Sequence, residues 1–287
     1  MTASGIHHVT AIAGPARRNL DFYTGALGLR LIKKTVNFDD PGTYHLYYGD
    51  ESGRPGTILT FFPWEHAATG RAGVGETQEI ALRVPQGSIG FWTHRLIAHG
   101  LAPERAERFS ETALAFRDPD GMRLALVGVP GIEDEAAWSY GDVPAEHALR
   151  GVHGVSLMLE DGAATAAVLT DVFGFQAVGQ DGQTSRFQVP DTTPGTIVDL
   201  HSVGGFLPGR QGRGSVHHLA FRATDDARQD EMVRRLATNH GISTTEQKDR
   251  NYSGQCISAS PAACCSRSRP TSRASPWTSR SKRSVKR

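Results

Sequence analysis

The sequence predicts an α+β protein built from four copies of one β-α-β-β-β unit. Three observations indicate this. The string Gly5-Ile-His-His-Val-Thr-Ala-Ile12 returns near the other end of the chain as Ser215-Val-His-His-Leu-Ala-Phe-Arg222. Two similar strand-like runs begin at Thr77 and Gly151. The aligned positions His8, Glu79, Gly154 and His218 lie 71, 75 and 64 residues apart, and a nearly constant period of this kind indicates internal repeats.

The first unit has the complete pattern. After the strand 5–12, residues Arg17–Leu27 have the apolar spacing of an amphipathic helix, and Gly28 follows as a helix-ending signal. Three β-branched or aromatic runs complete the unit: Leu29–Val36, Thr43–Tyr48 and Thr57–Phe62.

The other units follow the same order of elements. For the second unit we expect a strand at Thr77–Val84, a helix at Gly90–His99 and a last strand within Asp118–Leu126. For the third we expect a strand at Gly151–Met158, a helix at Ala163–Phe173 that stops at Gly174, and a last strand near Thr196–His201. The fourth begins at Val216. Its helix is expected from Asp225 to about Asn239, with Asp225 or Asp226 as N-cap and Gly241 beyond its end.

A change in composition separates two halves. Residues 130–149 are rich in Pro, Gly and acidic side chains, which is typical of a linker. We therefore expect a first domain at 1–130 (units 5–64 and 77–128), a linker at 131–150 and a second domain at 151–252. Residues 253–287 are expected to form a disordered tail, so the last unit is incomplete.

The bulk composition fits a soluble globular protein, with 38% hydrophobic and 21% charged residues in 287. The sequence has no run of about 20 apolar residues, so we expect no membrane-spanning helix. The N-terminus lacks the basic and apolar segments of a signal peptide, so we expect a cytoplasmic protein. The sequence is compatible with a homo-oligomer.

The charge is unevenly distributed along the chain. Residues 253–287 contain eight Lys or Arg and no acidic residue, and they hold all three cysteines. The first 252 residues therefore carry 23 of the 31 basic residues against all 30 acidic ones, a net charge of −7. An acidic body argues against nucleic-acid binding. The cysteines show no zinc-site spacing.

The repeated His-His pairs suggest half of a metal site. Successive strand residues point to opposite faces, so one His of each pair is expected to face the interior and its neighbour to face away. A hydrogen-bonded His that binds nothing is the alternative for each. Two pairs at matching repeat positions favour the metal.

These motifs resemble the vicinal oxygen chelate superfamily, which includes glyoxalase I, bleomycin-resistance proteins and extradiol dioxygenases. The resemblance covers residues 5–252 and points to a two-domain branch of ring-cleaving dioxygenases for hydroquinone- or catechol-like rings. The strings that carry it are Gly5–Ile12, Asp21–Leu29, Thr35–Tyr48, Phe61–Trp64 and Val216–Phe221.

The resemblance implies an Fe(II) site with two His and one Glu, the facial triad of non-haem iron oxygenases, with Mn(II) or Zn(II) as alternative metals. Unit 2 offers Ala125 and unit 3 offers Gly154 at the ligand positions, so these two units cannot build it. We therefore predict one metal cup from the first and last units, with His8 and His218 as ligands. The substrates would be a small aromatic compound and O2, with no nucleic-acid or membrane partner.

Two further residues are candidates for catalysis. His45 and Tyr252 would orient the substrate or exchange protons with it, although a hydrogen-bonded His and a packed Tyr are the plainer interpretations. The aromatic residues around His45 are expected to be mostly core, with a pocket wall as the alternative: Tyr44, Tyr47, Tyr48, Phe61, Phe62 and Trp64.

The sequence after Tyr252 has the character of a shifted reading frame. Inserting one T after the Tyr252 codon, with suitable GC-rich codons, converts the tail into YFRSVHLREPGGVLFEIATD and onward. That string contains a strand, a Pro-Gly-Gly turn and a second strand with a Glu, as the resemblance requires for the third ligand. As written, the chain would hold two ligands of three and be unstable or inactive. A disordered basic tail is the alternative.

Two other activities compete with the dioxygenase. A glyoxalase-like lyase or transferase would use Zn or Ni and turn over without oxygen. A metal-free protein that binds an aromatic ligand would not depend on His8 or His218. One scaffold hosts many activities, so the fold alone does not choose among them.

Overall fold

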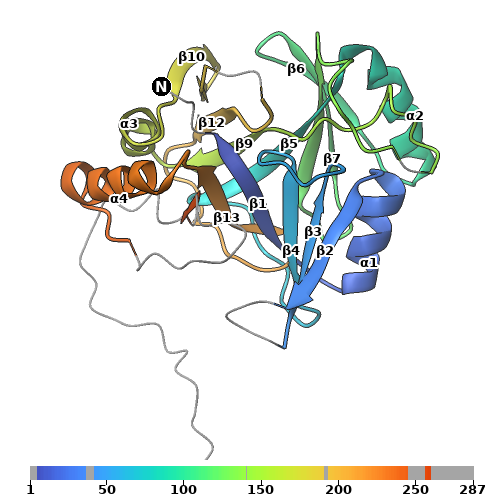
Figure 1. The fold of residues 1–287 in the computed structure, drawn as a ribbon, viewed down its shortest axis with the longest axis horizontal. Coiled ribbons are helices and arrows are strands. Elements are labelled where there is room, and N and C mark those ends of the chain that lie inside the picture. Colours follow the sequence, from blue (N-terminus) through green and yellow to red (C-terminus); the bar gives the residue numbers. More distant parts are fainter. Residues whose placement is uncertain (1–4, 37–41, 140, 191–192, 245–255, 260–287) are drawn as a thin grey trace, which may run out of the picture.

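Strands from the four units combine into two hydrogen-bonded sheets. The structure is a computed structural model that describes residues 5–36, 42–139, 141–190, 193–244 and, for the backbone, 256–259. Figure 1 shows strands at the centre of the molecule and helices on its flanks. The predicted class, α+β with repeated β-α-β-β-β units, is confirmed.

The first and fourth units form a six-stranded sheet. Its strands run in the order β14-β13-β1-β4-β3-β2. Their bounds are β1 Ile6–Ala13, β2 Arg30–Val36, β3 Tyr44–Gly49, β4 Ile58–Pro63, β13 Ser215–Arg222 and β14 Cys256–Ala259. The central contact is antiparallel, between β1 and β13, and β1 also pairs in parallel with β4.

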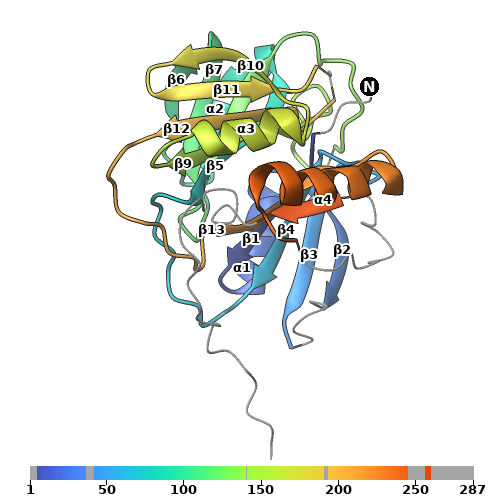
Figure 2. The ribbon, with the colours of Figure 1, turned by 90° about the vertical axis from the view of Figure 1, so that its left-hand side faces the viewer.

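The second and third units form an eight-stranded sheet in the order β10-β11-β12-β9-β5-β8-β7-β6. Its strands are β5 Glu76–Pro85, β6 Glu104–Arg108, β7 Glu111–Arg117, β8 Arg123–Val129, β9 Val152–Leu159, β10 Gln176–Asp181, β11 Thr184–Gln188 and β12 Ile197–Ser202. Figure 2 shows this sheet above the six-stranded one. Each sheet takes strands from both predicted halves, so the domain division at 130–150 stays a prediction.

The helices follow the predicted positions closely. α1 (Ala16–Leu20) continues into a π-helical segment, η1 (Asp21–Ala26), and the two together replace the single helix expected at Arg17–Leu27. The others are η2 (Gln86–Ser88, one 3₁₀ turn), α2 (Ile89–Ala98), α3 (Ala163–Asp171) and α4 (Asp226–His240). Among the described residues, no helix is long and apolar enough to cross a membrane.

Both ends of α4 are capped as predicted. The carboxylate of Asp225 accepts a hydrogen bond from the backbone N–H of Arg228 at 2.7 Å. At the other end, Gly241 has φ of 66°, a left-handed conformation that glycine adopts without a steric penalty. These caps satisfy backbone groups that the helix itself leaves without partners.

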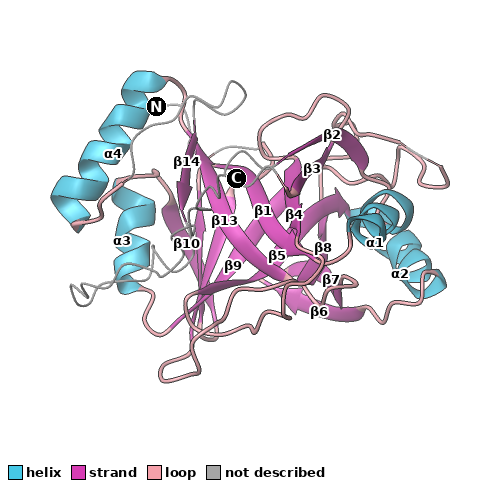
Figure 3. Ribbon diagram, turned by 90° about the horizontal axis from the view of Figure 1, so that it is seen from below, coloured by secondary structure: helices cyan, strands magenta, loops and turns pink. Residues whose placement is uncertain are grey.

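The helices lie in two pairs at opposite ends of the molecule, as Figure 3 shows. Arg95 of α2 donates to the carbonyl oxygens of Ala26 (2.8 Å) and Gly25 (2.6 Å), which ties α2 to η1. Arg235 of α4 donates to the carbonyl oxygen of Asp171 at 2.9 Å, which ties α4 to α3. The helices thus pair within each half of the chain, whereas the strand pairs β1–β13 and β5–β9 join the two halves.

The alternation of side chains along β3 and β4 divides the aromatic cluster. Tyr48 and Phe61 are fully buried and pack around Tyr23, whose ring lies 4.4 Å from that of Phe61. Tyr47 and Trp64 are only half-buried and lie on the other side with Phe62, and Tyr44 is exposed. The cluster is therefore part core and part lining of the opposite face.

One expectation about the tail is wrong. Residues after about 253 were expected to lack packed structure, but Cys256–Ala259 form β14 and pair antiparallel with β13. A sheet ladder is made by backbone N–H and C=O groups, so an edge strand needs few particular side chains to form. β14 occupies the edge that would otherwise be open beside β13.

Candidate metal centre

Two β-bulges place the paired histidines. Along the β1–β13 ladder, Ile6 faces Phe221 and His8 faces Ala220, so His7 is an extra residue on β1. Thr10 faces His218 and Ala11 faces Val216, so His217 is an extra residue on β13. A bulge bends the strand and re-aims its side chains.

The bulges overturn the expected alternation within each pair. The Nδ1 atoms of His7 and His8 lie 2.9 Å apart, and so do the Nδ1 atoms of His217 and His218. Neighbours on a regular strand would point to opposite faces. Each pair instead presents two imidazoles that touch each other.

His8 and His218 are the histidines that meet across the two units. Their ring centroids lie 5.5 Å apart with an interplanar angle of 80°. Both side chains are half-buried. His218 also contacts Thr10, whose Oγ1 lies 3.0 Å from its Nε2. The two residues predicted as metal ligands are thus in direct contact, although 210 positions separate them.

The other member of each pair faces a different environment. Burial, and then the positive charge of Arg222, lower the pKa of His7 to about 4, so its imidazole is neutral at neutral pH. The ring of His217 lies edge-on to Phe62 and Trp64, with centroids 5.4 and 6.1 Å away. His217 therefore belongs to an aromatic wall beside the site.

His45 reaches the same face from β3. Its Nε2 lies 2.9 Å from the hydroxyl of Thr60, and its Nδ1 lies 2.9 Å from the hydroxyl of Tyr47. Its ring packs against Phe62 at 4.4 Å. The register explains the grouping, because Thr60 pairs with both Thr10 and Tyr47.

The structure therefore assembles three of the four predicted site residues on one face. His8, His218 and His45 lie on the six-stranded sheet, while Tyr252 lies outside the described residues. Thr10 and Thr60 were not predicted. Their signal in the sequence was a lone hydroxyl within each of two apolar strands, HHVTAIA and ILTFFP, and both side chains are fully buried.

The donors that converge here suit part of a metal site. Imidazole is a common ligand for Fe, Mn and Zn, and His8 and His218 supply two such side chains. No group of three or more His, Cys, Asp or Glu that could hold a metal occurs in the described part of the chain. A complete facial triad therefore needs a third ligand from outside it.

Comparison with known proteins agrees with this geometry. Residues 5–126 match the model of the Glyoxalase/Bleomycin resistance protein/Dioxygenase superfamily. The chain is 43% identical over 249 residues to "Putative ring-cleaving dioxygenase MhqO" of Bacillus subtilis, covering 86% of this chain and 78% of that protein. It is 30% identical over 256 residues to chlorohydroquinone/hydroquinone 1,2-dioxygenase of Sphingobium indicum, covering 87% and 79%.

Solved structures are also similar to this chain. A Bacillus subtilis crystal structure, described as a "putative dioxygenase", aligns with a TM-score of 0.82 at 42% identity over 88% of this chain and 80% of that one. Glyoxalase I from Zea mays aligns with a TM-score of 0.62 at 14% identity over 83% and 81%, which shows a shared fold. The chain belongs to the Glyoxalase/Bleomycin resistance protein/Dioxygenase superfamily. Within it, the curated relatives described here carry the names of ring-cleaving dioxygenases.

Proposed function

We propose that this protein is an Fe(II)-dependent ring-cleaving dioxygenase of the extradiol type, acting on a hydroquinone- or catechol-like ring and O2. The observation that carries the proposal is the contact between His8 and His218. These residues come from the first and last units and meet at two matched bulges on one sheet. The relative named as a hydroquinone dioxygenase supports the substrate class.

His8 and His218 would hold the metal, with a third ligand from outside the described residues. Bound Fe(II) would supply the electronic link between the aromatic ring and O2, and Mn(II) could take its place with the same donor types. We also propose a cytoplasmic location. The assignment of His8 and His218 over His7 and His217 is part of this proposal, and the ring contact supports it.

The surrounding side chains fit an aromatic substrate. Phe62 and Trp64 stack with centroids 6.2 Å apart and form, with His217, a wall beside the histidines. An aromatic wall favours contact with a planar ring and excludes water from one side of it. His45 and Tyr47 lie next to this wall, and the Tyr47 hydroxyl, which contacts His45 Nδ1, is the group that would meet a phenolic substrate.

Oxygen uptake tests the proposal. The protein is purified with its reading frame after Tyr252 restored, loaded with Fe(II) under anaerobic conditions and mixed with hydroquinone or catechol in an oxygen electrode. We expect substrate-dependent O2 uptake with a ring-opened product, and no uptake without metal. An absence of uptake on every hydroquinone and catechol tried contradicts the proposal.

The same samples distinguish the competing functions. Turnover of a substrate without oxygen would identify a lyase or transferase. An aromatic ligand whose affinity is unchanged in His8→Ala and His218→Ala would identify a metal-free binding protein. A dioxygenase loses both metal and O2 uptake in these variants.

The reading frame after Tyr252 enters the design of this test. We propose that one base is missing there, on the basic, acid-free composition of residues 253–287. Sequencing the coding DNA across the codons for Asn251 to Cys256 tests this directly. A chain with the frame restored is assayed beside the chain as written, and we expect O2 uptake in the restored chain.

A further inference from the structure

A line of hydrogen bonds starts at His218 of the candidate metal centre and crosses four neighbouring strands. It links His218 on β13, Thr10 on β1, Thr60 on β4 and His45 on β3, and it ends at Tyr47 on the same strand. The distances are 3.0 Å from His218 Nε2 to Thr10 Oγ1, 2.7 Å from Thr10 Oγ1 to Thr60 Oγ1, 2.9 Å from Thr60 Oγ1 to His45 Nε2 and 2.9 Å from His45 Nδ1 to Tyr47 Oη.

The two threonines at its centre are completely buried. Thr10 and Thr60 each have an exposed fraction of 0%. A buried hydroxyl without a hydrogen bond costs roughly 1–3 kcal/mol, so each must be satisfied within the protein. Each hydroxyl here bonds to the other and to one imidazole. Loss of either hydroxyl therefore interrupts this line of hydrogen bonds between His218 and His45.

The fold itself does not require this line. In the eight-stranded sheet, Ala81 on β5 pairs with Ala125 on β8 as Thr10 pairs with Thr60. Ala115 pairs with Ala125 as Tyr47 pairs with Thr60, which places Ala113 at the position of His45. The same scaffold is thus built with four alanines where the six-stranded sheet has two threonines, a histidine and a tyrosine. The polar line accompanies the paired histidines.

The line can be polarised in only two directions. A hydroxyl that accepts from one neighbour donates to the other, and a neutral imidazole has one N–H and one bare nitrogen. If His218 Nε2 donates to Thr10, then Thr60 donates to His45 Nε2, and His45 Nδ1–H donates to Tyr47. In the opposite direction every donor becomes an acceptor. The tautomers of His218 and His45 are therefore coupled through the two hydroxyls.

We propose that Thr60 is a positioning residue that, through Thr10, couples the tautomer of His45 to that of His218. The coupling fixes which ring nitrogen of His218 carries the proton, and whether the Tyr47 hydroxyl accepts from His45 or donates to it. Its meaning for catalysis rests on the proposed function. The hydrogen-bond line itself does not.

Histidine tautomers in the metal-free protein test this. The protein is labelled with ¹⁵N-histidine, and two-bond ¹H–¹⁵N spectra are recorded at a pH where both rings are neutral. His45 and His218 are assigned from His45→Gln and His218→Gln. We expect each ring to show one dominant tautomer. In Thr60→Val, which keeps the side-chain shape but removes the hydroxyl, we expect both rings to move toward a mixture.

Two variants separate coupling from packing. Thr60→Ser restores the hydroxyl and should restore both tautomers, and it covers the case in which Thr60→Val fails to fold. Thr57→Val is the matched control, because Thr57 is buried just before β4 and its hydroxyl bonds to the Arg54 carbonyl at 2.7 Å, outside the line. A Thr60→Val protein that folds with an unchanged His218 spectrum overturns the proposal, as does a Thr60→Ser protein that folds with the mixed spectrum.

Metal affinity gives a second reading. Co(II) is titrated into each variant and followed by its visible absorption. Changes to groups that orient a metal-binding His commonly weaken metal affinity by 10- to 100-fold. We therefore expect Thr60→Val to bind Co(II) about 10-fold more weakly, and Thr57→Val to bind it with unchanged affinity. An equal Co(II) affinity in Thr60→Val and the unchanged protein counts against the proposal. Absence of O2 uptake with intact tautomer coupling would reject the dioxygenase and leave the coupling standing.

Discussion

The two sheets have the same backbone pattern but carry different side chains at the matching positions. In the six-stranded sheet, His8 and His218 stand beside the bulged residues His7 and His217. In the eight-stranded sheet the bulges recur at Gln78 and His153, and the residues beside them are Glu79 and Gly154. The backbone pattern is therefore the same, and only the side chains decide whether a metal can be held.

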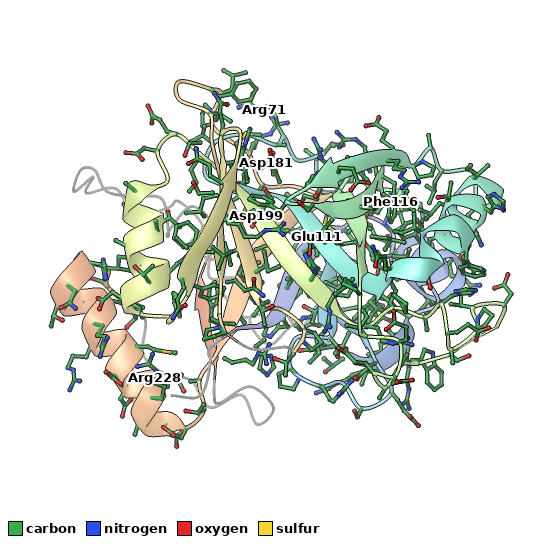
Figure 4. All side chains as sticks on the ribbon, turned by 90° about the horizontal axis from the view of Figure 1, so that it is seen from above. Arg71, Glu111, Phe116, Asp181, Asp199 and Arg228 are labelled. Atoms are coloured by element: carbon green, nitrogen blue, oxygen red, sulfur yellow. The ribbon has the colours of Figure 1, made fainter. Side chains whose placement is uncertain are left out.

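Paired charged side chains fill the interior of the eight-stranded sheet. Arg186 pairs with Glu111 at 2.5 Å and with Asp199 at 2.8 Å, and His153 lies 3.2 Å from Glu111. Arg108 pairs with Glu79 across the same space. Figure 4 places Glu111 and Asp199 next to each other in the interior. About 20 Å³ of cavity remains, enough for one water molecule.

This contrast explains why we propose a metal site in only one of the two sheets. A carboxylate that already accepts from an arginine has its oxygens occupied and its charge compensated. The interior of the eight-stranded sheet thus contains acidic groups whose charges are paired with arginines. The six-stranded sheet has imidazoles and hydroxyls at the matching positions.

The largest expected effect is the loss of metal from the six-stranded sheet. In His8→Ala or His218→Ala, we expect Fe(II) content near zero and O2 uptake lowered about a thousandfold or more, since a bound metal supplies several kcal/mol of transition-state stabilisation. Metal analysis of the purified variants checks this. His153→Ala, at the matching bulge of the eight-stranded sheet, should keep its metal. Equal loss in all three variants would break the comparison.

The next effect concerns stability. Arg186→Met leaves Glu111 and Asp199 without their shared partner, and Arg186 is only 9% exposed. Removing one partner of a buried ion pair costs about 3–5 kcal/mol. We expect the free energy of unfolding in urea to fall by that amount. Arg17→Met removes the exposed pair with Asp21 and should change it by less than about 1 kcal/mol.

Acid should weaken the same network. Burial alone would raise the pKa of Glu111, but hydrogen bonds and charges from His153 and Arg186 outweigh it and hold the pKa at about 2, below the ordinary 4.5. A lowered pKa stabilises the fold above pH 4.5, and this stabilisation is lost as the pH falls from 4.5 to 2.

Glu111→Gln removes this contribution. The unfolding free energy of the variant should decline less steeply between pH 4.5 and 2, by at most about 3 kcal/mol over that interval. Glu104→Gln, at an exposed position of β6, is the matched control. Identical acid limbs for Glu111→Gln and the unchanged protein would show that the network contributes nothing to acid stability.

The smallest effect sharpens the comparison at Gly154, which stands at the position of His218. A Cβ added there would lie 2.6 Å from the carbonyl oxygen of Ile197 on β12. The neighbouring backbone cannot move away cheaply, so Gly154→Ala should cost about 2 kcal/mol of unfolding free energy. Gly90→Ala, with nothing within 4 Å of its Cβ, should not destabilise. A stable Gly154→Ala protein would mean that side chains are tolerated at this position.

Much of the architecture could be predicted because its signals are local. Gly28 and Gly174, which have positive φ, follow the ends of two helices. Asp225 caps the N-terminus of α4, the helix that starts at the next residue. The union of the first and fourth units followed from the repeated His-His pairs. These arguments need only the residues themselves and a constant period.

The remainder depends on contacts between distant strands. Neither bulge has a local sequence signal, so the alternation rule misplaced His7 and His217. The partnership of Thr10 with Thr60 requires the register of β1 against β4, and that of Arg186 with Glu111 requires two strands from different units. β14 formed from residues expected to be unstructured, because a ladder depends on backbone groups rather than on side-chain pattern.

The sheet order also has a consequence for synthesis on the ribosome. β1 is made long before its antiparallel neighbour β13, with a separation of 208 residues between Thr10 and His218. At about 5–20 residues per second, β1 waits roughly 10–40 s for that neighbour. The strands β5 to β12 are contiguous in the chain, so we expect this middle portion to fold first. In stalled nascent chains ending after β12, it should resist protease while β1 is still cleaved.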